Sequence, residues 1–242
     1  FSEISDSFEF SEGLILSSGD ANLGTGPNSG SGQEGPQDSG DLGWPGDEDL
    51  TELLDGNTEN ASVIEFDFIP LATTLSFRFI MASEEYDALS EDPQNYECNF
   101  SDVFGFFLTH PDGTITNLAV IPDTDIPITI TNIHPASSDC NGDGVVDEND
   151  AANPEYFGAY VPVGDGPIAY DGYTRAFTAQ AEVIQGQSYH IKLAVADAGD
   201  EALDSAVFLE AGSFDISYDI GEDILIDSPN VPCIGTEFTL EA

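Results

Sequence analysis

Hydrophobic and polar side chains alternate along several short segments of the chain. Ile64, Phe66 and Phe68 alternate with Glu65 and Asp67, and the same alternation recurs at 75–81 and 189–195. Such alternation turns one face of a β-strand towards a core and the other towards solvent. These three segments therefore predict half-buried antiparallel strands.

Shorter apolar runs predict further strands at 13–17, 103–109, 116–121, 127–133, 174–183 and 206–218. Gly212 indicates a bulge or bend in the last of them. Residues 47–54 predict a short helix capped by Asp47, and the polar stretch 18–46 predicts a long surface loop. Because no long amphipathic helix is indicated, we predict an all-β fold, a jelly-roll-like antiparallel β-sandwich with long acidic loops.

The pattern changes near residue 220. Residues 223–232 are typical of a linker, and the run from Cys233 to Leu240 is typical of a first strand. We therefore expect the sandwich to span 1–219, and 220–242 to hold a linker and the start of a following domain. The chain begins at Phe1 without a signal peptide, so we expect a fragment or a processed product.

The charge of the chain is extreme. Its 242 residues are 40% hydrophobic, enough for a core, but 47 acidic residues face only 3 basic ones, for a formal net charge of −44. Nucleic acid and anionic membranes are excluded as partners, because both require clustered Lys and Arg. No apolar run is long enough to span a membrane. Such self-repulsion must be offset, and divalent cations or high salt would do so.

One acidic segment has the spacing of a calcium loop. Residues 139–150 read Asp-Cys-Asn-Gly-Asp-Gly-Val-Val-Asp-Glu-Asn-Asp. An EF-hand loop supplies oxygen ligands from positions 1, 3, 5, 7, 9 and 12, with Gly at position 6. Those ligand positions hold Asp139, Asn141, Asp143, the Val145 carbonyl, Asp147 and Asp150. The loop resembles those of dockerin-type calcium repeats.

Three features define how this loop is interpreted. Its ligands are all hard oxygens, which favours Ca²⁺ over zinc. No flanking helices are indicated, so the loop should not act as a helix-opening sensor. Asp150 is shorter than the glutamate usual at its position. The alternative is an acidic turn without metal.

Further carboxylates follow or precede the predicted strands. Because strand ends can meet at one rim of a sandwich, carboxylates there would repel one another unless a cation binds. We therefore hypothesise a second calcium site. Its candidate ligands are Glu84, Glu85, Asp102, Asp197, Asp200 and Asp204. The alternative is a set of caps and turns in which each Asp bonds its own backbone.

Catalysis is poorly supported by the sequence. Glu84 and Glu85 could serve glycoside hydrolysis, but neighbouring residues of a strand point to opposite faces. The three histidines lack metal-ligand spacing, and no nucleophile elbow or phosphate-binding loop occurs. We therefore expect no enzyme. Aromatic residues near strand ends and in loops could instead stack on sugars. They are Trp44, Tyr86, Tyr96, Tyr170 and Tyr173.

The three cysteines are too few for a disulfide scaffold and lack the spacing of a zinc site. Cys98 and Cys140 could pair, and Cys233 could pair outside the sandwich. The sequence leaves the connectivity open.

An ordered set of motifs resembles the choice-of-anchor L domain over about residues 8–219. The set comprises GLILSSGD at 13–20, GPN at 26–28, GDEDL at 46–50, EFDF at 65–68, SEEY at 83–86, DVFGFF at 102–107, YDGYT at 170–174, YHIKL at 189–193 and DSAVFL at 204–209. The resemblance implies a secreted or surface protein of bacteria, notably Bacteroidota, exported through type IX secretion, with immunoglobulin-like domains downstream. It implies no catalytic residues.

The chain departs from the family pattern at 94–101 and around 137–156, which look like insertions. Each insertion holds one cysteine, and this favours a disulfide between Cys98 and Cys140. The second insertion holds the calcium loop.

Together these observations predict a calcium-stabilised extracellular module of a large bacterial surface adhesin or appendage, acting in adhesion or structural display. The alternative is a calcium-dependent carbohydrate-binding module. We expect its partners to be an extracellular glycan or protein ligand, further domains of the same polypeptide and other copies in an appendage. Nucleic acid and membrane insertion are not expected.

Overall fold

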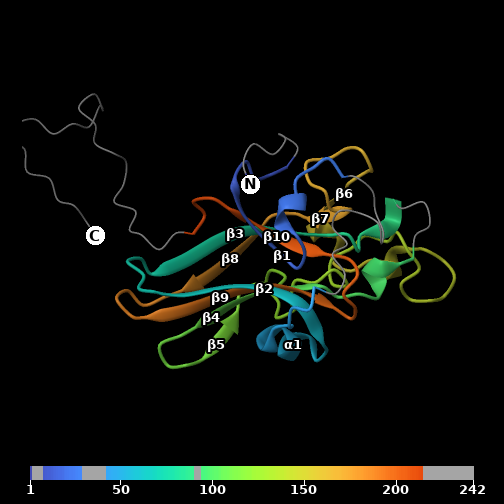
Figure 1. The fold of residues 1–242 in the computed structure, drawn as a ribbon. Helices are drawn as coiled ribbons and strands as arrows, with labels where there is room; N and C mark the ends of the chain where they lie inside the picture. Colours follow the sequence, from blue (N-terminus) through green and yellow to red (C-terminus); the bar gives the residue numbers. More distant parts are fainter. Residues whose placement is uncertain (2–7, 29–41, 90–93, 215–242) are drawn as a thin grey trace, which may run out of the picture.

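The strands form two antiparallel sheets that pack face to face (Figure 1). The structure is a computed structural model, and it describes residues 1, 8–28, 42–89 and 94–214. One sheet orders its strands β1 (Gly13–Ser17), β10 (Ser205–Glu210), β3 (Thr74–Ser83), β7 (Gly172–Thr174) and β6 (Phe157–Tyr160), with β8 (Phe177–Glu182) also beside β3. The other orders them β2 (Thr58–Phe68), β9 (Tyr189–Ala198), β4 (Val103–Thr109) and β5 (Ile115–Asn117).

The strand order is that of a jelly roll. Leaving out the short β6 and β7, one sheet reads β1-β10-β3-β8 and the other β2-β9-β4-β5. The chain passes between the sheets from β1 to β2, β2 to β3 and β3 to β4, and again from β8 to β9 and β9 to β10, as in two interlocked Greek keys. The predicted all-β sandwich is therefore confirmed.

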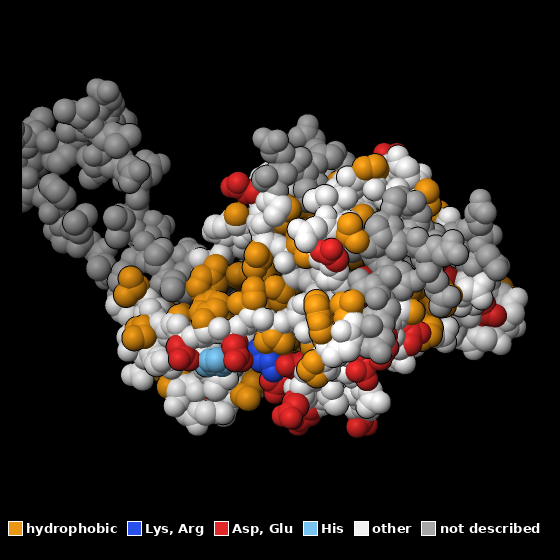
Figure 2. Space-filling model, in the orientation of Figure 1, with side chains coloured by type: hydrophobic (Ala, Val, Ile, Leu, Met, Phe, Trp, Pro, Cys, Tyr) orange, Lys and Arg blue, Asp and Glu red, His pale blue; other side chains and the backbone are white. Residues whose placement is uncertain are grey.

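Aromatic side chains fill the space between the sheets. Phe79 of β3 and Phe104 of β4 face each other with ring centroids 4.9 Å apart, and both are buried. Burying one such side chain stabilises a fold by about 1.5–3 kcal/mol. Figure 2 shows a band of hydrophobic side chains across the middle of one face, over the region between β3 and β2. The alternating strands thus build the predicted core.

A short helix, α1 (Glu48–Leu54), covers the outer face of the second sheet (Figure 1). Asp47 caps it by accepting hydrogen bonds from the N–H groups of Asp49 and Leu50. Leu50 is buried against residues of β4 and β9, including Phe107. The cap and the apolar side chain explain why so short a helix forms.

Four strand ends meet at one end of the sandwich. Ser205, at the start of β10, pairs with Ser83 at the end of β3. Val103, at the start of β4, pairs with Ala196 near the end of β9. The acidic residues that flank these strand ends are therefore brought close together.

Four predicted strands differ in the structure. Residues 127–133 make turns and isolated bridges rather than a strand, because their apolar side chains, such as Ile128 and Ile130, are buried without a ladder partner. The strand predicted at 116–121 is only β5, because the Asn117 side chain accepts the N–H groups of Phe106 and Ala119 in place of ladder bonds.

The other two predicted strands are divided or shortened in the structure. The strand predicted at 174–183 divides into β7 and β8. The strand predicted at 206–218 ends at Glu210, and Gly212 takes a φ of 72° in the following turn. Residues 215–242, with the predicted linker, lie outside the described residues. Among the described residues, no helix is long and apolar enough to cross a membrane.

Candidate functional site

The loop at 139–150 is folded around the carboxylate of its first residue. Asp139 accepts backbone hydrogen bonds from Gly142 at 2.8 Å, Asp143 at 3.1 Å and Gly144 at 2.8 Å. Gly142 and Gly144 have φ values of 75° and 85°, a left-handed backbone that glycine adopts without a steric cost. The glycine predicted at the sharp turn therefore lies where that turn occurs.

Asp150 closes the other end of the loop. Its carboxylate accepts the N–H groups of Asn141 at 3.0 Å and Asp147 at 2.8 Å. These backbone hydrogen bonds hold the pKa of Asp150 below its usual value, so the carboxylate is ionised at neutral pH. Asp143 and Val145, at two further ligand positions, are exposed. The loop thus presents oxygen atoms at the surface.

The loop is anchored at its base and at its second residue. His134 and Ala152 exchange two backbone hydrogen bonds of 2.9 Å and 3.0 Å below the loop. Cys140 forms a disulfide with Cys98, with the two Cα atoms 5.2 Å apart. Only single 3₁₀ turns, Glu148–Asp150 and Pro154–Tyr156, adjoin the loop in the described residues, so it lacks the helices of an EF-hand.

A second group of carboxylates is buried where the strand ends meet. Five of the six residues predicted for a second site expose between 0% and 2% of their surface: Glu84, Glu85, Asp102, Asp197 and Asp204. The sixth, Asp200, is exposed in the loop between β9 and β10. The structure therefore brings the predicted set to one end of the sandwich.

Hydrogen bonds fix one side of this group. Asp102 accepts the backbone N–H of Ala198 at 2.8 Å, and Asp197 accepts the Asn60 side-chain amide at 3.0 Å. One oxygen each of Glu85, Asp102 and Asp197 is buried and has no hydrogen-bond partner among the described residues. Leaving a buried charged oxygen unpaired costs several kcal/mol, roughly. These three oxygens therefore need either a proton or a cation.

Burial and mutual repulsion act on the same three residues. Burial, followed by the charges of Asp102, Asp197 and Asp200, raises the pKa of Glu85 well above its usual value. Burial and the charge of Asp197 do the same to the pKa of Asp102. Burial also raises the pKa of Asp197, although its hydrogen bond from Asn60 opposes this. The site strongly disfavours its own negative charge.

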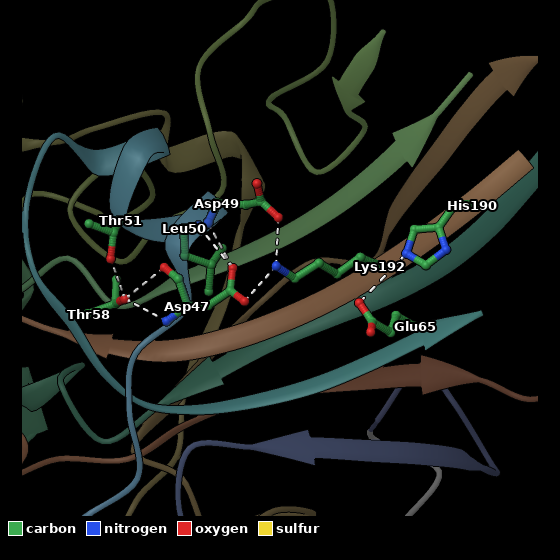
Figure 3. Close-up of polar contacts among 8 residues, drawn as sticks. All are labelled: Asp47, Asp49, Leu50, Thr51, Thr58, Glu65, His190 and Lys192. Atoms are coloured by element: carbon green, nitrogen blue, oxygen red, sulfur yellow. Dashed lines mark hydrogen bonds and ion pairs between the residues drawn. The ribbon is translucent and has the colours of Figure 1, made fainter. Parts of the chain in front are cut away.

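No basic side chain of the chain relieves that charge, since all three lie in described residues and are engaged elsewhere. Lys192 contacts Asp47 and Asp49 at 2.6 Å each, at the start of α1 (Figure 3). Arg78 pairs with Glu9 and Glu210, and Arg175 donates to the backbone of Phe157. On the face in Figure 2, the one blue patch lies among red acidic groups, one of which separates it from the histidine.

Neither place is a finished coordination shell. Within the part of the chain that the structure describes, no group of three or more His, Cys, Asp or Glu side chains is arranged to hold a metal ion. In the 139–150 loop the carboxylates of Asp139, Asp143 and Asp150 accept backbone N–H groups. Calcium binding at either place would require side chains to rotate inwards.

A family model supplies the context for these sites. The model of the choice-of-anchor L domain matches residues 1–215. The chain belongs to the choice-of-anchor L domain family. Membership indicates a surface-associated extracellular module. No curated protein and no solved structure matched the chain.

In this choice-of-anchor L domain, several buried polar residues lie outside the two sites predicted from the sequence. Asp171, before β7, accepts the Asn28 side-chain amide at 2.7 Å. Asn60 lies at a bulge in β2 with a φ of 49°. An asparagine inside a strand-like run signals such a bulge, because its short polar side chain tolerates a left-handed backbone. Glu97 is buried and accepts the hydroxyls of Ser137 and Tyr160.

The aromatic residues considered for sugar stacking differ in exposure. Tyr86 and Tyr170 are fully buried, and their hydroxyls are bonded to the Ile133 carbonyl and to Ser17. Neither can stack on a sugar, so the sequence was misleading at these two positions, where apolar neighbours bury the rings. Trp44, by contrast, is 48% exposed and lines a groove of 490 Å³ beside β1.

Proposed function

We propose that this chain is a calcium-stabilised extracellular module of a large bacterial surface adhesin or appendage, and that it serves in adhesion or structural display without catalysis. Family membership supports the surface setting. The folded 139–150 loop carries the calcium part of the proposal, because its left-handed glycine turn and the oxygen side chains at its ligand positions follow the pattern of a calcium loop.

Calcium would act as a local cross-link that holds the loop to the sandwich. The loop is an insertion on a sandwich whose hydrophobic core is already complete, and it lacks the helices that a calcium sensor would rearrange. A bound cation would offset the repulsion among its carboxylates and hold the insertion against the rest of the sandwich. In a chain with a net charge of −44, this stabilises the fold in calcium-containing surroundings.

Calorimetric unfolding with and without calcium tests the proposal. At calcium about 100-fold above Kd, binding adds about 2.7 kcal/mol, which raises the Tm of a domain this size by about 5–10 °C. Asp139→Ala with Asp143→Ala should remove most of the response of the loop. Asp125→Asn, at an exposed position outside the loop, is the control. A wild-type Tm that calcium leaves unchanged would overturn the proposal.

A carbohydrate-binding role is a second candidate, and the exposed Trp44 favours it. The groove beside it is also lined by Asp20 and Asn22 of the turn after β1. An aromatic face next to hydrogen-bonding side chains is suited to a sugar ring. Binding to a glycan array that is lost in Trp44→Ala and kept in Trp44→Phe would support this function, and an array without hits would remove it.

A further inference from the structure

A small cavity lies at the buried carboxylates. It has a volume of about 20 Å³, and Glu85 and Asp200 line it together with Tyr96, Phe100, Ala202 and Leu203. A space of roughly 10–15 Å³ is enough for one water molecule, so the cavity can hold a single small ion.

The oxygens around this cavity point to a cation. Glu85 lies on the cavity wall with one buried oxygen that has no hydrogen-bond partner among the described residues. Asp102 and Asp197 each have another such oxygen, and the charges of both raise the pKa of Glu85. Two like charges 4 Å apart repel by about 4 kcal/mol at an effective dielectric constant of about 20. A divalent cation converts this repulsion into attraction.

We propose that Glu85, Asp102, Asp197 and Asp200 bind one calcium ion in this cavity, at a buried site separate from the 139–150 loop. The proposal deepens the proposed function and rests on it for the calcium-containing surroundings only. Of the six residues predicted for a second site, Glu85 and Asp200 line the cavity, and the charges of Asp102 and Asp197 act on Glu85 from beside it. Asp204 and Glu84 do not line the cavity, although the charge of Asp204 raises the pKa of Asp197.

The ligand set selects the type of ion. All four side chains offer carboxylate oxygens, which suit calcium, and no thiolate or imidazole that zinc would prefer borders the cavity in the described residues. Four carboxylates exceed the charge of one Ca²⁺, so a bound ion would leave the site anionic but far less strained. Asp200 is exposed and offers the route by which the ion enters.

The segment that lines one side of the cavity is covalently linked to the 139–150 loop. Tyr96 and Phe100 pack edge to face with centroids 5.7 Å apart, and both line the cavity. Between them lies Cys98, whose disulfide partner Cys140 is the second residue of the 139–150 loop. The disulfide therefore joins the segment over the buried site to the loop at the surface.

Calcium titration by calorimetry in a chain without the loop site tests the proposal. The starting variant carries Asp139→Ala and Asp143→Ala, is stripped with EDTA and is then titrated with calcium chloride at neutral pH. We expect one site to remain. Adding Glu85→Gln and Asp197→Asn should weaken it at least about tenfold, because affinity follows the number of charged ligands. Adding the exposed pair Glu155→Gln and Asp125→Asn should change nothing.

The unfolding temperature in EDTA guards against a loss of fold. Glu85→Gln and Asp197→Asn remove two buried, mutually repelling charges without changing shape, so the variant should melt no lower than its parent. If that pair fails to fold, Glu85→Gln alone decides the question. A starting variant that binds no calcium overturns the buried site while leaving the loop proposal intact. A wild type that binds none overturns both.

Discussion

Removing the disulfide between Cys98 and Cys140 should destabilise the domain strongly. The bond joins two segments whose cysteines are 42 residues apart in sequence. Closing a loop of that length in the unfolded chain costs about 4 kcal/mol of chain entropy, which the disulfide removes from the folding equilibrium. We expect the double variant Cys98→Ser, Cys140→Ser to lose about 3–4 kcal/mol, or roughly 6–16 °C in Tm for a domain this size.

The assay is urea unfolding followed by near-ultraviolet circular dichroism, with saturating calcium and again in EDTA. Cys233→Ser is present in every variant, because that cysteine lies outside the described residues and would otherwise exchange with the freed thiols. Cys233→Ser alone should match the wild type. A loss below about 1 kcal/mol would refute the reasoning, since it would mean that the two insertions stay together in the unfolded chain.

Three further predictions concern the scaffold. Lys192→Met should cost about 2 kcal/mol in urea unfolding, because it leaves two partly buried aspartates at the start of α1 without their cation; an unchanged midpoint would refute this. Burial raises the pKa of Glu97, although hydrogen bonds from Ser137 and Tyr160 oppose it, so its ionisation destabilises the fold as the pH rises from 4.5 towards neutrality. Glu97→Gln should therefore gain stability relative to wild type over that range, and a pH-independent difference would contradict the shift. Gly46→Ala should cost about 1–3 kcal/mol, because its Cβ would overlap the Thr58 carbonyl, whereas Gly56→Ala, with open space, should cost little; equal effects would be contrary to expectation.

The sandwich could be predicted from alternation because burial of one strand face leaves a regular trace in the sequence. Phe68 in β2, like Leu193 and Val195 in β9, carries that trace, whereas Phe66, predicted on the same buried face, is 38% exposed. The segment 127–133 carries the same apolar composition, yet it lies in turns. Burial alone does not distinguish a strand from a buried loop, because the difference lies in the hydrogen-bond partner of the backbone.

The candidate sites differ in how far the sequence could describe them. The 139–150 loop is local, so spacing alone located its ligands. The buried group combines residues from four strand ends, and only the jelly-roll register decides that Glu85 faces Asp102 and Asp197. The Asn60 amide reaches Asp197 because β2 has a bulge at this point. A two-residue alternation of apolar and polar positions does not predict such a bulge.

The two calcium proposals also place the disulfide in a new context. If both ions bind, the segment from Tyr96 to Phe100 connects them through Cys98. Calcium and oxidation would then stabilise the same end of the sandwich, which suits an extracellular setting where both are available. Urea unfolding of the cysteine variant in calcium and in EDTA reports on this coupling directly.

The number of calcium ions bound per chain tests the central claim most directly. Native mass spectrometry of the EDTA-stripped wild-type domain, titrated with calcium up to extracellular concentrations, gives that number as discrete mass steps. We predict two ions per chain, one at the 139–150 loop and one at the buried carboxylates around Glu85. A chain that remains free of calcium throughout the titration would contradict the account.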